Sequence, residues 1–220
     1  MREHQRRIQR IVLLLAAAAC LAEPAAATII DGNVTCCGGA TFVKLTVPLA
    51  NPFGLPNSVG DDTFQSPNLF GFDESQNTAV IGSPLLLDEF SGANTLPVGT
   101  IVASHYIFFD PTNGHVTGTV NFDSNVLGIL TSTSHLAASD YLANTGVNYL
   151  NPGARGLEAG DSVTISGPRQ ILFDTFASTP GDYVRVLTEF SPSAVPEPGA
   201  GLLVLSGVGL LWLLRRVRTA

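Results

Sequence analysis

The sequence predicts an all-β protein: a single β-sandwich-like ectodomain with one short helix, flanked by an N-terminal signal peptide and a C-terminal transmembrane sorting helix. Short runs rich in β-branched and aromatic residues recur between Gly, Pro, Asn and Asp, which is the pattern of sandwiches and barrels. Residues 28–194 contain no linker or internal repeat and are numerous enough for one domain with a real core. Apolar runs near both ends of the chain predict the two flanking segments.

Residues 1–27 have the features of a secretory signal peptide. A basic start is followed by nine apolar residues, Ile11 to Ala19, and then by a small-residue stretch that ends at Ala27. As a helix the apolar run would be about 14 Å long, too short to cross a hydrocarbon core of ~30 Å. We therefore expect cleavage between Ala27 and Thr28. Cys20 leaves lipidation as a less favoured alternative, because lipoprotein signals also place a Cys just after the apolar run.

Cleavage there would leave two adjacent cysteines, Cys36 and Cys37, in an oxidising compartment. Adjacent Cα atoms lie about 3.8 Å apart, whereas unstrained disulfides need roughly 4.4–6.8 Å. A disulfide between the two would therefore be strained and easily reduced, although the following Gly38 and Gly39 give the backbone freedom to form it. Two free thiols, or a link to another chain, are the alternatives. Metal binding is the least favoured, because no second Cys pair or His cluster follows at zinc-site spacing, and we predict no metal and no cofactor.

Turn residues divide the central segment into predicted strands. These strands span 41–47, 78–81, 100–109, 115–122, 126–131, 162–166, 170–176 and 183–190. The stretch 51–66 is rich in Pro, Gly and Asn and is expected to be loop. A single helix is predicted over 134–143, with Ser134 as its cap.

The clearest predicted unit is a hairpin, in which the strand 101–109 turns through 110–114 into the next strand. In that second strand apolar and polar residues alternate, which places one face in the core and the other in water. The apolar positions are Val116, Val120 and Phe122, and the polar ones are Thr117, Thr119 and Asn121.

Charge and motifs exclude some functions. Residues 28–194 carry fifteen acidic and four basic side chains, a net charge of −11, which argues against a nucleic-acid partner. Neither a G-x-S-x-G nor an H-E-x-x-H motif occurs. His105, His115 and His135 show no distinctive triad order, so we expect structural or solvent-facing histidines and predict no catalytic residue.

Acidic and aromatic residues offer weaker candidates for binding. The acidic groups could supply calcium ligands, but none follows the twelve-residue loop spacing, so a solvated acidic surface is favoured. These groups are Asp61-Asp62, Asp73-Glu74, Asp88-Glu89, Asp110 and Asp123-Ser124-Asn125. Aromatic side chains could stack on sugar rings, but most are better explained as core. They are Phe42, Phe53, Phe64, Phe70, Phe72, Tyr106, Phe108 and Phe109.

The C-terminus carries the most specific pattern. Sixteen residues, 199–214, include no charge, and Arg215, Arg216 and Arg218 follow at once. Seven Leu and two Val favour insertion by roughly −3 to −5 kcal/mol before the Gly and Ser offsets. The trailing arginines are expected to stay cytoplasmic and stop translocation, which places the preceding domain outside.

Directly before this helix lies Val195-Pro196-Glu197-Pro198, whose two prolines hold the backbone extended and accessible. Motif, short apolar helix and arginine cluster together closely resemble the PEP-CTERM sorting domain of exosortase substrates. The resemblance covers residues 195–220. It implies that an exosortase recognises Pro196, Glu197 and Pro198, that the inner membrane holds the precursor transiently, and that the mature protein reaches the cell surface or extracellular matrix.

The sequence thus predicts a non-enzymatic exported protein, and the resemblance implies a structural or adhesive role in the exopolysaccharide matrix of a biofilm. Two other classes remain open: a secreted hydrolase acting on polysaccharide or ester bonds, and a calcium- or glycan-binding module. A cleft with perturbed carboxylates or an activated Ser would favour the first. Converging acidic loops would favour the second.

Overall fold

The structure is a computed structural model that describes residues 27–52 and 54–190. The predicted signal peptide up to residue 26, Cys20 included, and the predicted sorting signal 195–220 lie outside the described residues. In the described part of the chain, no helix is both long and apolar enough to cross a membrane.

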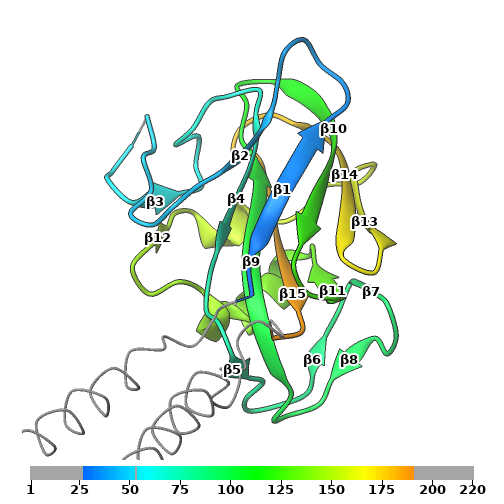
Figure 1. The fold of residues 1–220 in the computed structure, drawn as a ribbon. Coiled ribbons are helices and arrows are strands. Elements are labelled where there is room, and N and C mark those ends of the chain that lie inside the picture. The colour runs from blue at the N-terminus through cyan, green and yellow to red at the C-terminus, as the bar shows by residue number, and fades with distance from the viewer. Residues whose placement is uncertain (1–26, 53, 191–220) are drawn as a thin grey trace, which may run out of the picture. The chain divides into compact units, whose positions relative to one another are not determined.

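Strands make up most of the regular structure, with one α-helix and two 3₁₀ turns among the described residues (Figure 1). The strands are β1 Ile29–Val34, β2 Phe42–Lys44, β3 Ser58–Val59, β4 Leu69–Asp73, β5 Thr78–Ala79, β6 Leu85–Leu86, β7 Glu89–Phe90, β8 Thr95–Leu96, β9 Ile101–Phe109, β10 Gly114–Phe122, β11 Val126–Leu130, β12 Asn148–Tyr149, β13 Ser162–Gly167, β14 Gln170–Ala177 and β15 Asp182–Thr188. The helices are α2 Thr133–Ala138, η1 Asp140–Leu142 and η2 Pro152–Ala154.

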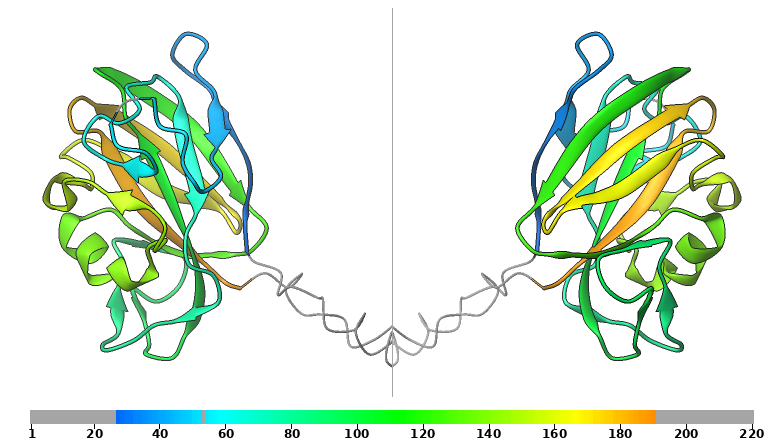
Figure 2. Two further views of the ribbon diagram at one scale, coloured as in Figure 1. Left: turned by 90° about the vertical axis from the view of Figure 1, so that its left-hand side faces the viewer. Right: turned by 90° about the vertical axis from the view of Figure 1, so that its right-hand side faces the viewer.

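Two sheets form the layers of the domain. One is antiparallel, in the order β1-β10-β14-β13. The other runs β2-β4-β9-β15-β11-β7, with β5 pairing to β9 and a single parallel pair, β2 with β4. In the right-hand view of Figure 2 the first sheet faces the viewer, and in the left-hand view α2 and the segment around β3 cover the second. The prediction of an all-β, sandwich-like domain is confirmed.

The core between the layers follows the alternation expected of strands. In β10, Val116, Val120 and Phe122 are fully buried, while the intervening polar residues are half-exposed. They meet Ile107 and Phe109 from β9 in one apolar cluster. The predicted inward and outward faces of residues 116–122 are therefore correct.

A second core covers the outer face of the larger sheet. Because β9 is buried on both sides, Tyr106 and Phe108 point away from the sandwich interior into this cluster. Phe64 packs on Phe108 with 4.9 Å between ring centroids. The prediction that most of the aromatic residues belong to the core is confirmed. Phe42 is only partly buried, and Phe53 lies outside the described residues. The buried members of the predicted set are Phe64, Phe70, Phe72, Tyr106, Phe108 and Phe109.

The predicted hairpin is wrong, because β9 and β10 belong to different sheets. Both edges of β9 are taken by β4 and β15, and both edges of β10 by β1 and β14. The turn at 110–114 therefore carries the chain from one layer to the other. Local turn chemistry predicted the reversal correctly but could not determine the partner of each strand.

The predicted helix is shorter than expected. It starts at Thr133, and after Ala138 the chain tightens into η1. Ser132, not Ser134, is the N-cap residue, and its hydroxyl bonds to the Asp88 carboxylate instead of capping the helix. Asp88 also accepts the backbone N–H groups of Thr131 and Ser132, so the helix start is anchored to a distant loop.

The described domain begins and ends at the same end of the sandwich. Thr28 N–H donates to Asp123 Oδ1, and Asp123 N–H donates back to the Thr28 carbonyl. At the end of β15, Glu189 N–H donates to the Asn125 carbonyl, two residues further along the same loop. β1 then runs away from this end, so the segment after Val34 lies at the opposite end (Figure 1).

Candidate functional site

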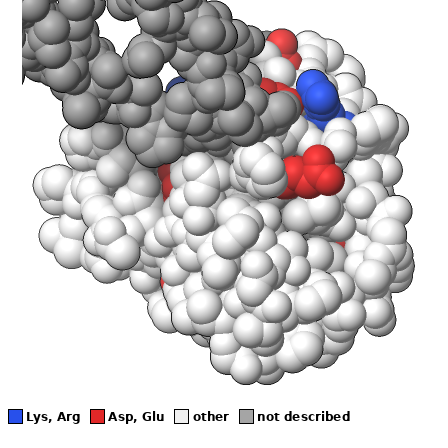
Figure 3. All heavy atoms as spheres, turned by 60° about the horizontal axis from the view of Figure 1, so that its bottom comes forward, with Lys and Arg blue, Asp and Glu red and all other residues white. Residues whose placement is uncertain are grey.

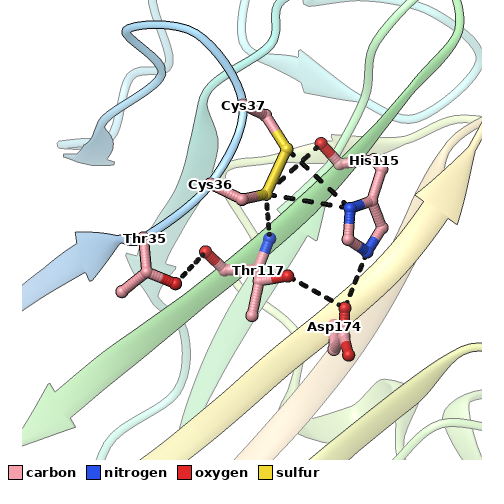
Figure 4. Close-up of a disulfide and its surroundings, with 6 residues drawn as sticks. All are labelled: Thr35, Cys36, Cys37, His115, Thr117 and Asp174. Atoms are coloured by element: carbon pink, nitrogen blue, oxygen red, sulfur yellow. Dashed lines mark hydrogen bonds and ion pairs between the residues drawn. A yellow bond between two sulfur atoms is a disulfide. The ribbon is translucent and has the colours of Figure 1, made fainter.

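The most distinctive chemical group at that opposite end is a disulfide between the adjacent residues Cys36 and Cys37 (Figure 4). Thr35, just after β1, anchors the loop through its N–H and hydroxyl, which both donate to the Thr117 carbonyl of β10. Cys37 then adopts φ of 70°, in the left-handed region that non-glycine residues rarely enter. Gly38 and Gly39 continue with positive φ, and the chain reverses toward β2. Of the alternatives left open by the sequence, the structure has the vicinal disulfide.

A histidine from a distant part of the sequence faces both sulfur atoms. His115 lies at the start of β10, and its Nδ1 is 3.7 Å from Cys36 Sγ and 3.8 Å from Cys37 Sγ. The pairing of β1 with β10 brings it there, because Val34 lies opposite Gly118 in that register. In the part of the chain that the structure describes, the two sulfurs and this imidazole are the group of ligand atoms close enough to hold a metal ion.

The other nitrogen of the same ring is held by an aspartate. His115 Nε2 is 2.7 Å from Asp174 Oδ1 on the neighbouring strand β14. An ionised carboxylate can only accept, so Nε2 carries the proton in this hydrogen bond. In the neutral ring, Nδ1 then presents its lone pair to the sulfurs. The Thr117 hydroxyl donates to the same carboxylate oxygen at 3.0 Å and fixes its position.

The sulfur of Cys36 also receives a backbone donor, because Thr117 N–H points at Sγ with 3.0 Å between nitrogen and sulfur. Such a donor stabilises negative charge on the sulfur. The cluster is accessible from solvent, since the side chains of His115 and Asp174 are each 46% exposed and Cys37 is exposed. The site thus combines two sulfurs, a nitrogen lone pair and an orienting carboxylate at the surface.

The other two histidines among the described residues, His105 and His135, also pair with aspartates. His135 Nδ1 lies 2.7 Å from Asp88 Oδ1 at the start of α2. His105 Nδ1 lies 2.8 Å from Asp73 Oδ1, and its Nε2 is 3.1 Å from the hydroxyl of Thr188. This Asp, His and Thr order resembles a hydrolytic triad, but Thr188 is fully buried and a substrate could not reach its hydroxyl. The expected hydrogen-bonded histidines are thus present.

Asp73 connects His105 to the start of the domain. It accepts from Ile29 N–H and the Thr28 hydroxyl and forms an ion pair with Lys44 at 2.9 Å. Burial alone would raise the pKa of this carboxyl, but the hydrogen bond and charge of His105, with the donors from Ile29 and Thr28, hold the pKa well below its usual range. Thr28, the first residue expected after cleavage, is thereby fixed in place.

Arg185 and Glu74 form a buried ion pair. Glu74 accepts Arg185 Nε at 2.6 Å and Nη2 at 3.0 Å, and neither side chain is exposed. The same carboxylate also accepts the hydroxyls of Ser104 and Tyr149, both at 2.6 Å. The remaining Arg185 nitrogen, Nη1, donates to Ser139 Oγ and to the Leu136 carbonyl. Arg185 thereby links Glu74 to the C-terminal end of α2.

Two further carboxyls are buried at the turns that join the layers. Burial, with a smaller contribution from the carboxylates of Asp161 and Glu158, raises the pKa of Asp182 to about 7. Burial likewise raises the pKa of Asp110 to about 6, and the hydrogen bond from Phe64 N–H offsets part of that rise.

Several acidic residues therefore depart from the expected solvated surface. Glu74, Asp110 and Asp182 are buried, and Asp73 and Asp88 are engaged by internal donors. The strand pattern could not reveal this, because each partner comes from a distant segment. These carboxylates do not converge on a shared space, so they form no ion site among the described residues.

A shallow surface pocket of about 520 Å³ lies beside the end of β15. Glu189 supplies the only carboxylate among the described residues that line it. It lacks the pair of acidic groups that glycoside hydrolysis uses.

The structure places some of the residues predicted from the sequence. Ala27 is buried, and Thr28 lies in the network described above. The sorting motif, Val195 to Pro198, and the arginines at 215, 216 and 218 lie outside the described residues. His115 and Asp174 were missed as site residues, because sequence spacing gave no reason to place them beside the cysteines. No family model, curated protein or solved structure matches this chain.

Proposed function

We propose that this chain is an exported, non-enzymatic protein, sorted by an exosortase through residues 195–220 and displayed at the cell surface or in the extracellular matrix. The inner membrane holds the precursor, and the β domain then acts as a structural or adhesive module in an exopolysaccharide matrix. The observation that supports this best is that the domain starts and ends at one end. A domain tethered through the segment that follows β15 can then present its opposite end outward.

The surface near the two ends of the described domain fits this arrangement. Between residues 75 and 109 the only Asp, Glu, Lys or Arg side chains are Asp88 and Glu89. Figure 3 shows this end of the molecule, where uncharged side chains form nearly all of the visible described surface. Several apolar side chains are exposed there: Ile81, Leu86, Val98 and Ile101. An uncharged, partly apolar end tolerates proximity to a membrane better than the acidic remainder of the domain does.

The site geometry supports a structural role over the alternatives. A hydrolase needs an accessible nucleophile or a pair of carboxylates in a cleft, and the Thr188 hydroxyl is buried while the pocket beside β15 holds one carboxylate. A calcium module needs free converging carboxylates, and most of those predicted bind internal donors instead.

The test follows two epitopes, one in the ectodomain and one at the C-terminus, in cells with and without their exosortase. We expect the wild-type ectodomain epitope to reach the surface or medium without the C-terminal epitope only when the enzyme is present. Glu197→Ala should leave both epitopes together in the inner membrane. Glu189→Ala is the matched control, because it removes a nearby glutamate that lies outside the motif. This variant should sort as wild type does.

Neutral residues in place of Arg215, Arg216 and Arg218 should act differently, by removing the charges that stop translocation and fix orientation. Wild-type protein that keeps both epitopes in the inner membrane despite the enzyme would refute the sorting proposal. It would leave a simple membrane anchor.

A further inference from the structure

We propose that Cys36, Cys37 and His115 form a redox-gated binding site for a thiophilic metal ion such as Zn²⁺, with Asp174 positioning the histidine. The site is closed while the sulfurs are bonded to each other and opens when the disulfide is reduced. This inference does not depend on the sorting proposal, because it concerns only the described domain.

The distances around the histidine already fit a metal centre. With Zn–S of about 2.3 Å and Zn–N of about 2.0–2.1 Å, a tetrahedral ion separates its nitrogen and sulfur ligands by about 3.6 Å. His115 Nδ1 lies 3.7 and 3.8 Å from the two sulfurs. Reduction therefore has to change only the sulfur–sulfur separation, which the same tetrahedral geometry places at about 3.8 Å.

The loop has room for that change. A side chain at Gly38 or Gly39 would meet no atom within 4 Å, so the segment after Cys37 is not packed against the sheet. Cys36, in contrast, stays fixed by the Thr117 N–H and by the backbone bonds of Thr35. Cys37 can therefore move away from Cys36 while His115 and Cys36 keep their places.

The surroundings of the imidazole are those of a metal ligand. Metal-bound histidines usually donate their second N–H to a carboxylate, which fixes the ring and strengthens the lone pair. Asp174 does this at 2.7 Å and is itself held by the Thr117 hydroxyl. His135 also has an aspartate partner, but among the described residues no cysteine sulfur lies close enough to bind a metal ion together with it. Two soft thiolates with one borderline imidazole select Zn²⁺ or Cu⁺ over Ca²⁺ or Mg²⁺, and they leave a fourth position for water.

A thiol–disulfide reductant donates two electrons, the sulfur–sulfur bond breaks, each sulfur takes one proton, and the reductant becomes a disulfide. The metal ion then displaces the two thiol protons and binds both thiolates and His115 Nδ1. Oxidation of the two thiolates by a disulfide of higher potential restores the bond and releases the ion.

The experiment uses the full chain in detergent, with Cys20→Ser so that Cys36 and Cys37 are the remaining cysteines. A water-soluble phosphine reduces the sample, because it takes its oxygen from water and leaves two thiols without adding a competing thiol. After its removal, the affinity for Zn²⁺ is measured by competition with a chromophoric chelator, and Co²⁺ is added separately as a spectroscopic probe. We expect the reduced protein to bind one Zn²⁺ at least about 100-fold more tightly than the oxidised protein. Co²⁺ should give sulfur-to-metal charge-transfer bands.

Variants separate the proposed site from a simple dithiol. In the reduced state, His115→Gln should weaken Zn²⁺ binding by about 100-fold, and Asp174→Asn by about 10–100-fold while the charge-transfer bands persist. His135→Gln, the matched control, should bind as the parent does. Equal affinity of the oxidised and reduced proteins, unchanged affinity in His115→Gln, or a disulfide that resists the phosphine under native conditions would each overturn the proposal. Far-UV circular dichroism confirms that each variant is folded.

Discussion

Removal of the Glu74 carboxylate should be among the most destabilising single changes in the domain. In Glu74→Leu the fully buried Arg185 guanidinium loses its buried counter-charge and keeps only the half-exposed Asp140 at 3.5 Å, and the hydroxyls of Ser104 and Tyr149 lose their acceptor. Breaking one partner of a buried ion pair typically costs about 3–5 kcal/mol. We expect Glu74→Leu to lower the free energy of unfolding by that amount. Arg185→Met should cost less, because the carboxylate keeps the two hydroxyl donors.

The double variant, Glu74→Leu with Arg185→Met, tests the reason for this cost. With both charges gone, its destabilisation should be smaller than the sum of the two single changes by about 2–3 kcal/mol. The control is Asp140→Asn, since Asp140 contacts Arg155 and Arg185 but is 45% exposed, and such partly solvated pairs are worth about 1 kcal/mol or less. The assay is urea unfolding of the full chain followed by circular dichroism. Additive single effects, or a cost below about 1 kcal/mol for Glu74→Leu, would refute the reasoning.

Two further predictions concern the sandwich interior. A buried acid whose pKa is raised in the folded state favours folding only while it is protonated, so the pKa of about 7 at Asp182 predicts that stability falls as pH rises from about 4 through 7. Asp182→Asn should remove up to about 3 kcal/mol of the difference in unfolding free energy between pH 5 and pH 8, measured by urea titration at both values; an unchanged difference would contradict the assignment. Val120→Asp should destabilise the domain by several kcal/mol, because Val120 is fully buried, whereas Thr119→Asp on the half-exposed face should cost less than about 1 kcal/mol. Equal melting temperatures for that pair would show that the described register of β10 is wrong.

Local patterns predicted the longer strands, including the half-buried β10 and the largely buried β9 and β15, but left out β1 and β4. In β10 the alternation of Val116, Thr117 and their successors follows directly from the two-residue period of a strand. β1 and β4 were not predicted, because each contains a glycine where the chains pack too closely for a side chain. A Cβ at Gly32 would lie 2.4 Å from the Phe42 ring, and one at Gly71 would lie 2.7 Å from Ile107. The need for glycine at these two positions comes from tertiary contacts that the local sequence does not show.

The candidate site was hidden for the same reason. Cys36 and His115 are 79 positions apart, and Asp174 is 59 positions beyond His115. Only the pairing of β1 with β10 and of β10 with β14 brings them together. Without β1 in the prediction, no reasoning about spacing could place an imidazole beside the sulfurs. For this reason metal binding is the least favoured alternative for the two cysteines when only sequence spacing is considered.

The hydrogen bonds of Thr28 have a consequence for the predicted cleavage after Ala27. In the folded domain Ala27 is buried, and the N–H and carbonyl of Thr28 are both taken up by Asp123. A peptidase needs its substrate segment extended and exposed, so the predicted cleavage between these residues would have to precede the closure of the domain around them. Once cut, the Thr28 amide becomes an ammonium group beside the Asp123 carboxylate, and a neutral hydrogen bond becomes an ionic one. Removal of the leader would then strengthen the contact that holds the start of the folded domain in place.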